Sequence, residues 1–130
     1  MKYLYYKLWQ TFKKIPTNDM PATTAMIFLC MCHAANFITI HLILATYSII
    51  PLNFNSKIEI YSFSILLFSV ITLLDYLFLY RNREKLYEKY KDESKRQKLT
   101  GNILLILYIV VSFALVFYFG PKYTSSIAAQ

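Results

Sequence analysis

Glycine is almost absent from this chain, and its scarcity excludes several kinds of active site. The 130 residues include two glycines, Gly101 and Gly120, so there is no Gly-rich loop of the kind that holds phosphate in nucleotide-binding enzymes. The sequence also lacks a G-x-S-x-G turn, an H-E-x-x-H pair and closely spaced carboxylates suited to acid–base catalysis. We therefore predict a protein that is not an enzyme and needs no cofactor.

Cysteine and histidine are also scarce. Cys30 and Cys32 are two positions apart, so on a helix they point ~200° apart and cannot form a disulfide with each other. His33 and His41 are eight positions apart, which is about 12 Å along a helix and too far to bind one ion together. Neither pair predicts a metal site.

Charged residues are missing from three long stretches. The run from Ala22 to Ile50 contains no Asp, Glu, Lys or Arg, and about 20 apolar residues suffice to cross a hydrocarbon layer of ~30 Å. Ile60 to Tyr80 and Asn102 to Phe119 are of similar length, and Asp75 is the only charged residue in either. The sequence thus predicts an all-α integral membrane protein with three transmembrane helices.

The basic residues, which give a net charge of +7, are distributed unevenly. Four lysines precede the first span and eight Lys or Arg residues lie between the second and third, whereas only Lys57 and Lys122 lie on the other side. Cytoplasmic segments carry an excess of Lys and Arg, so we predict a cytoplasmic N-terminus and 81–100 loop in a cell inner membrane, with an external C-terminus. We expect no nucleic-acid partner, and we expect seven of the basic residues to meet anionic lipid headgroups: Lys7, Lys13, Lys14, Arg81, Arg83, Lys95 and Arg96.

The whole chain is predicted to form one membrane domain. Residues 1–16 are predicted to form an amphipathic helix in the membrane plane, with Leu4, Leu8 and Phe12 on one side and the lysines on the other; a flexible basic tail is the alternative. The first span is predicted at 20–50, the second with its cytoplasmic extension at 56–91, the third with its extension at 94–120, and an external tail at 121–130.

Three local signals set these boundaries. Capping boxes, in which a serine precedes a glutamate or glutamine by three residues, occur at 56–59 and 94–97 and predict helix starts. Gly120 and Pro121 predict the end of the third helix. The 81–100 segment is then a helical hairpin that turns near residues 91–93, and a loop lying along the headgroups is the alternative.

Three polar residues on different spans fall at similar depths. With a rise of 1.5 Å per residue, His33 lies about 10 Å, Asp75 about 7 Å and Tyr108 about 9 Å from the cytoplasmic edge. We predict a hydrogen-bonded polar layer of these three, with a structural role favoured over a proton or cation relay. Alternatively, Asp75 snorkels toward Arg81 and Arg83.

Two further faces are candidates for packing. Cys30, Asn36, His41 and Ser48 share one side of the first span and predict a packing face or a pore lining. Ser62, Ser69 and Thr72 form a small-residue stripe on the second, which allows close helix approach.

These features favour a non-enzymatic membrane subunit or accessory protein. It would oligomerise or pack against a membrane partner. The alternatives are an oligomeric pore or membrane-disrupting effector, and a small proton-coupled carrier that uses the polar layer.

Overall fold

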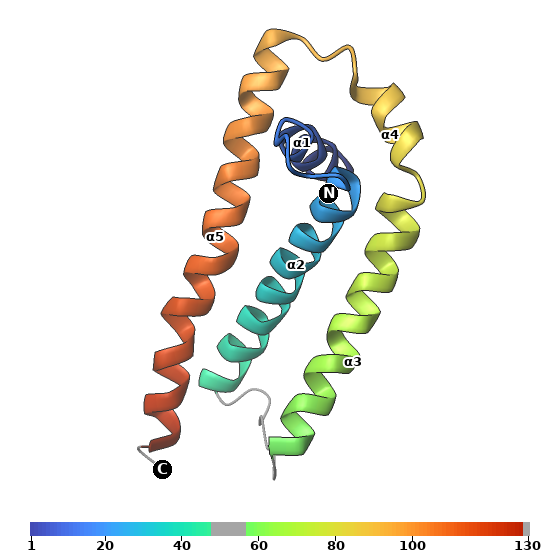
Figure 1. Cartoon of the computed structure of the whole chain (residues 1–130). Helices are drawn as coiled ribbons and strands as arrows, with labels where there is room; N and C mark the ends of the chain where they lie inside the picture. The colour runs from blue at the N-terminus through green and yellow to red at the C-terminus, as the bar shows by residue number, and fades with distance from the viewer. Residues whose placement is uncertain (48–56, 129–130) are drawn as a thin grey trace.

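The computed structural model describes residues 1–47 and 57–128, with the side chains of 57, 60, 61 and 123–128 excepted. This part of the chain contains helices and no strands, which confirms the predicted all-α class. The helices, shown in Figure 1, are α1 (Lys2–Phe12), α2 (Pro21–Thr46), α3 (Lys57–Asp75), the π-helical turn η1 (Tyr76–Tyr80), α4 (Arg83–Tyr90) and α5 (Lys95–Ala128).

Three helices are long and apolar enough to cross a membrane, as predicted: Pro21–Thr46, Ser62–Tyr80 and Lys95–Lys122. Helix α2 lies between the other two and packs more extensively on α5 than on α3. Figure 1 shows α3 and α5 on opposite sides of α2. The three long helices therefore form an open arrangement around α2 rather than a closed ring.

Helix α1 crosses one end of this arrangement and packs against α2, α4 and α5. We call this region, formed by α1, α4 and the first turns of α2 and α5, the α1 end. The main hydrophobic core lies mostly in it and comprises Tyr5, Leu8, Ala25, Met26, Leu29, Leu79, Leu86 and Leu105.

The orientation of α1 differs from the predicted one at Lys7. This residue was expected to face lipid headgroups with the other lysines, but its side chain is only 3% exposed. The physical reason is that neighbours cover α1 on several sides and that a carboxylate, Glu93, lies close enough to pair with the ammonium group. The helix also ends at Phe12, before Pro16.

The connection between the second and third long helices is a helical hairpin. Helix α4 ends at Tyr90 and α5 begins at Lys95. Both hydrogen bonds of the capping box are present: the Gln97 N–H donates to Ser94 Oγ at 3.3 Å, and the Ser94 N–H donates to Gln97 Oε1 at 2.9 Å. The chain therefore reverses within residues 91–94. The other predicted capping box begins at Ser56, outside the described residues.

Helix α5 is longer than predicted. The expected stop at Gly120 and Pro121 is wrong, because α5 contains Pro121 and continues to Ala128. Proline removes one helical hydrogen bond, but its fixed φ is compatible with a helix. A side chain added at Gly120 would enter open space, so no close packing at this point forces the chain to turn.

Candidate functional site

The first candidate site is the contact between α2 and α3 at Asp75. His33 Nδ1 lies 2.9 Å from Asp75 Oδ2, and Asp75 is 6% exposed. Asp75 is the only acidic residue in the three apolar helices. A buried carboxylate is stable only with a partner, and here the imidazole provides it.

The helix changes its winding directly after Asp75. In η1 the Arg81 N–H donates to the carbonyl oxygen of Tyr76 at 2.9 Å, a bond between residues five apart. The Asn82 side-chain amide donates to the carbonyl oxygen of Leu77 at 3.0 Å. Asp75 is buried beside α2, and Leu79 within the turn belongs to the main hydrophobic core. Single π-helical turns occur frequently at functional positions.

The predicted alternative was that Asp75 reaches toward Arg81 and Arg83. In the structure Asp75 contacts His33 instead. The Arg83 guanidinium stacks 4.6 Å from the centre of the Tyr80 ring and donates to the Tyr80 carbonyl oxygen at 3.3 Å. Its Nε lies 3.5 Å from Glu84 Oε1. Asp75 is therefore held by α2.

The third member of the predicted layer, Tyr108, is bonded elsewhere. Its hydroxyl accepts a hydrogen bond from Asn36 Nδ2 at 3.0 Å, whereas its ring centre lies 6.5 Å from that of His33. The prediction grouped Tyr108 with His33 only because the two residues lie at similar depths along their helices. Asn36 lies only one helical turn beyond His33, and that spacing was the signal for a second polar contact. The layer thus consists of two pairs, one on each side of α2.

The predicted packing face of α2 and the predicted small-residue stripe of α3 contact each other at one point. Cys30 Sγ lies 3.2 Å from Thr72 Oγ1, which joins a residue of each face. Ser62 and Ser69 are exposed, and Ser69 Oγ donates to its own helix at the Ile65 carbonyl oxygen, 2.7 Å away. Among the hydrogen bonds of the described residues, the one that joins this stripe to α2 is at Thr72.

His41 lies among aromatic rings. Its ring centre is 4.6 Å from that of Phe37 and 5.9 Å from that of Phe63 on α3. Its Nδ1 is buried and has no hydrogen-bond partner among the described residues. Ser48, the remaining member of this face, lies outside the described residues.

The second candidate site is the α1 end, where a carboxylate of the α4–α5 turn binds α1. Glu93 Oε1 lies 2.9 Å from the Lys7 ammonium, and Glu93 Oε2 accepts a hydrogen bond from the Tyr3 hydroxyl at 2.7 Å. Partial burial acts to raise the pKa of Glu93, but the hydrogen bonds from Lys7 and Tyr3 outweigh it, so the net pKa is lowered. Burial and the bond to Glu93 raise the pKa of Tyr3 to about 12. The contact therefore favours charged Glu93 and neutral Tyr3.

Two more features hold α1 in place. Tyr3 and Tyr6 pack against Tyr90, with ring centres 5.1 Å and 5.6 Å away, and Trp9 packs against Tyr87 at 5.7 Å. The side chain of Tyr3 also lies directly over Gly101, where an added Cβ would be only 2.7 Å from ring carbons. Glycine at this position is what permits the close approach of α1 to α5.

The remaining basic positions expected at the membrane surface differ in exposure. Lys13, Lys14, Arg81, Lys95 and Arg96 are exposed and Arg83 is half-buried. Among the described residues, no three His, Cys, Asp or Glu side chains are grouped so that they could hold a metal ion. Comparisons with protein families, curated proteins and solved structures give no match to this chain.

Proposed function

We propose that this chain is a non-enzymatic integral membrane subunit that packs against other membrane helices, either copies of itself or a membrane partner. Three apolar helices of spanning length support insertion in a bilayer. The excess of basic residues in the N-terminal segment and the 81–100 loop supports a cytoplasmic α1 end and an external C-terminus.

The observation that carries the proposal is an apolar groove of about 270 Å³ along α2. Its floor contains Ala34 and Ala35, and its walls come from α3 and α5. Small residues let another helix approach closely, and close packing is the main attraction between helices in a bilayer. The groove is lined by Met31, Ala34, Ala35, Ile38, Phe68, Phe113, Val116 and Phe117.

The outer faces of α3 and α5 support the same function. In the most apolar 18 residues of each span, 11% of the residues are buried in Ser62–Tyr80 and in Lys95–Lys122, against 28% in α2. The exposed residues are mainly Leu, Ile, Val and Phe, so lipid or other apolar helices are the surroundings that suit them. Ser62 and Ser69 on α3 offer a second place for close packing.

The test fills the groove with a bulky side chain. We expect Ala34→Trp to abolish the oligomer, or the co-purifying membrane partner, observed for the wild-type chain by native mass measurement in mild detergent. The matched control is Ala114→Trp, which adds the same side chain at an exposed position of α5 outside the groove and should leave the assembly intact.

A wild-type chain that is monomeric and carries no partner would contradict the proposal. Equal loss of assembly in both variants would contradict the assignment to the groove. Circular dichroism of both variants shows whether the helices still form.

A proton-coupled carrier is the second candidate, because carboxylates and imidazoles inside membranes form proton relays in some transporters and π-helical turns are frequent at functional sites. Proton-driven uptake by reconstituted vesicles that disappears in Asp75→Asn would support it, and uptake insensitive to this change would dismiss it. For the pore alternative, loss of membrane potential on expression should disappear in His33→Leu or Asn36→Leu. In a single chain, His33 and Asn36 face α3 and α5 rather than a lumen.

A further inference from the structure

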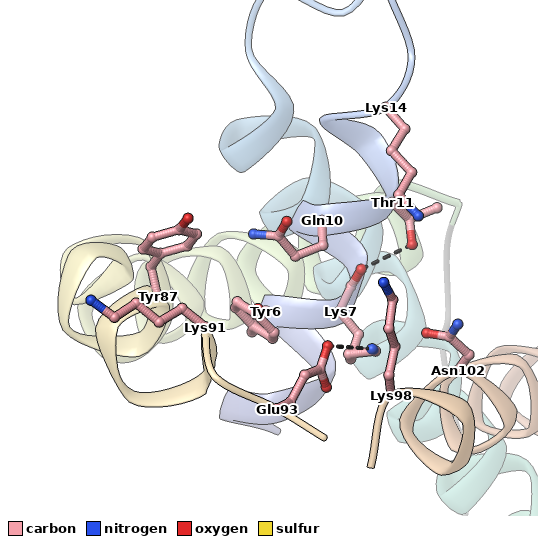
Figure 2. A pocket seen from close by; sticks show the side chains of 10 residues that line it. All are labelled: Tyr6, Lys7, Gln10, Thr11, Lys14, Tyr87, Lys91, Glu93, Lys98 and Asn102. Atoms are coloured by element: carbon pink, nitrogen blue, oxygen red, sulfur yellow. Dashed lines mark hydrogen bonds and ion pairs between the residues drawn. The ribbon is translucent and has the colours of Figure 1, made fainter. Parts of the chain in front are cut away.

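The α1 end contains a pocket of about 260 Å³ between α1, α4 and the start of α5 (Figure 2). It lies beside the Lys7–Glu93 ion pair, and Asn102, where the apolar run of α5 begins, is part of its wall. The lining residues are Tyr6, Lys7, Gln10, Thr11, Lys14, Tyr87, Lys91, Glu93, Lys98 and Asn102.

The lining is strongly basic. Four lysines face one glutamate, which leaves three positive charges. Glu93 is already bound by Lys7 and Tyr3. Lys91 is neutralised outside the pocket by Glu88, 2.6 Å from its ammonium, and Figure 2 shows its side chain directed away from the others.

Lys14 and Lys98 are the cations left for a ligand. Neither forms an ion pair with any described residue. Figure 2 shows their side chains reaching toward the same side of α1 from opposite directions, beside Thr11. Two ammonium groups directed into one recess repel each other, and a bound anion removes that repulsion.

Neutral polar groups complete the wall beside these two lysines. Thr11 and the Asn102 amide lie on the same side of α1 as Lys14 and Lys98. The Gln10 amide is directed to the other side, toward Tyr87.

We propose that this pocket binds a phosphate group held by Lys14 and Lys98. Phosphate offers several charged acceptor oxygens, and lysine is a common phosphate ligand. The cavity is larger than one phosphate, and the rings of Tyr6 and Tyr87 form a wall for an attached group. The phosphate is either that of an anionic lipid headgroup, which is within reach at the start of the apolar run, or that of a soluble ion.

Two measurements on the full-length chain in nanodiscs separate these sources. Calorimetric titration of inorganic phosphate into zwitterionic nanodiscs tests the soluble source. Retention of phosphatidylglycerol in native mass spectra, from nanodiscs that contain phosphatidylglycerol and a zwitterionic lipid, tests binding of the headgroup. One of the two measurements should detect binding by the wild-type chain. In that measurement we expect Lys98→Gln and Lys14→Gln each to weaken binding by about tenfold, the effect of one lost charge-assisted hydrogen bond.

The matched control is Lys85→Gln, which removes the same charge from an exposed position of α4 outside the pocket. It should retain wild-type binding. Equal loss in Lys85→Gln would show general attraction to basic charge and overturn the site. Absence of wild-type binding in both measurements would also overturn it. Both results are independent of whether the Ala34 groove binds another helix.

Discussion

The α1 end and the middle of the three long helices are held together in different ways. At the α1 end, most of the buried hydrophobic core, an aromatic cluster and a nearly buried ion pair fix α1, α2, α4 and α5 to one another. In the middle, α2 contacts α3 through the pairs His33–Asp75 and Cys30–Thr72, and it contacts α5 through Asn36–Tyr108.

The difference follows from the surroundings that each region is expected to have. Water drives apolar side chains together, so an end in contact with water gains stability by burying them. Lipid tails are as apolar as leucine, so helices inside a bilayer associate through small residues and a few hydrogen bonds. The α1 end, which we also call the clamp, is therefore held together by contacts within the protein. The apolar surface in the middle is suited to contact with lipid or with another helix.

The largest expected effect tests the clamp at Glu93. Glu93→Gln leaves the Lys7 ammonium buried without a carboxylate, and we expect the free energy of unfolding to fall by about 3 kcal/mol, the low end for a broken buried ion pair. Denaturant unfolding monitored by circular dichroism measures it. Glu84→Gln, at an exposed residue with only a weak contact to Arg83, should change stability by less than about 0.5 kcal/mol. Similar losses in both variants would show that the pair is not a clamp.

The two glycines provide the next comparison. Gly101→Ala places a Cβ against the Tyr3 ring, so we expect α1 to shift and stability to fall by about 2 kcal/mol, as in other overpacked positions. Gly120→Ala enters open space and should be neutral or stabilise the helix by up to about 1 kcal/mol. The same unfolding assay measures both. A neutral Gly101→Ala would mean that α1 does not approach α5 this closely.

A smaller effect is expected in the middle. A double-mutant cycle of His33→Leu and Asp75→Asn should give a coupling energy of about 1 kcal/mol, the upper part of the range for hydrogen bonds between membrane helices. A cycle of Asp75→Asn with Tyr108→Phe should give a coupling near zero, because Tyr108 is bonded to Asn36 instead. Strong coupling in the second cycle would restore the single three-residue layer.

The contacts of Glu93 and Tyr3 also predict a pH dependence. The folded pKa of Glu93 is lowered from 4.5, so its contribution is present above pH 4.5 and is lost as the pH falls below it. The folded pKa of Tyr3 is raised from 10.0 to about 12, so its contribution is present below pH 10.0 and is lost as the pH rises toward 12. Fluorescence of Trp9, the only tryptophan, should change in both ranges, and Glu93→Gln should remove the acid change. An unchanged acid response in this variant would contradict the assignment.

The sequence was most informative where the signal is local or depends on composition. Uncharged runs predicted three apolar helices, and Ser94 with Gln97 predicted the start of α5 from a spacing of three residues. Depth along the helix axis brought His33 and Asp75 to one level. The same argument failed to separate Tyr108 from them, because depth contains no information about the side of α2 on which a residue lies.

The rest could not be predicted because it depends on distant partners. Lys7 looks like any basic residue of an amphipathic helix until Glu93, far along the chain, is placed beside it. Gly101 looks like a weak point in a helix until Tyr3 lies over it. The continuation of α5 past Pro121 and the π-helical turn after Asp75 also left no recognisable mark in the residue pattern.

The position of α1 has a consequence for biogenesis. Tyr3 and Lys7 are synthesised first, yet their partners Glu93 and Gly101 emerge from the ribosome only when most of the chain has been made. Helix α1 can pack on α2 as soon as α2 has been synthesised, but its contacts with Glu93 and Gly101 can form only after the α4–α5 turn has followed. Complete docking of the first helix therefore depends on nearly the whole order of synthesis.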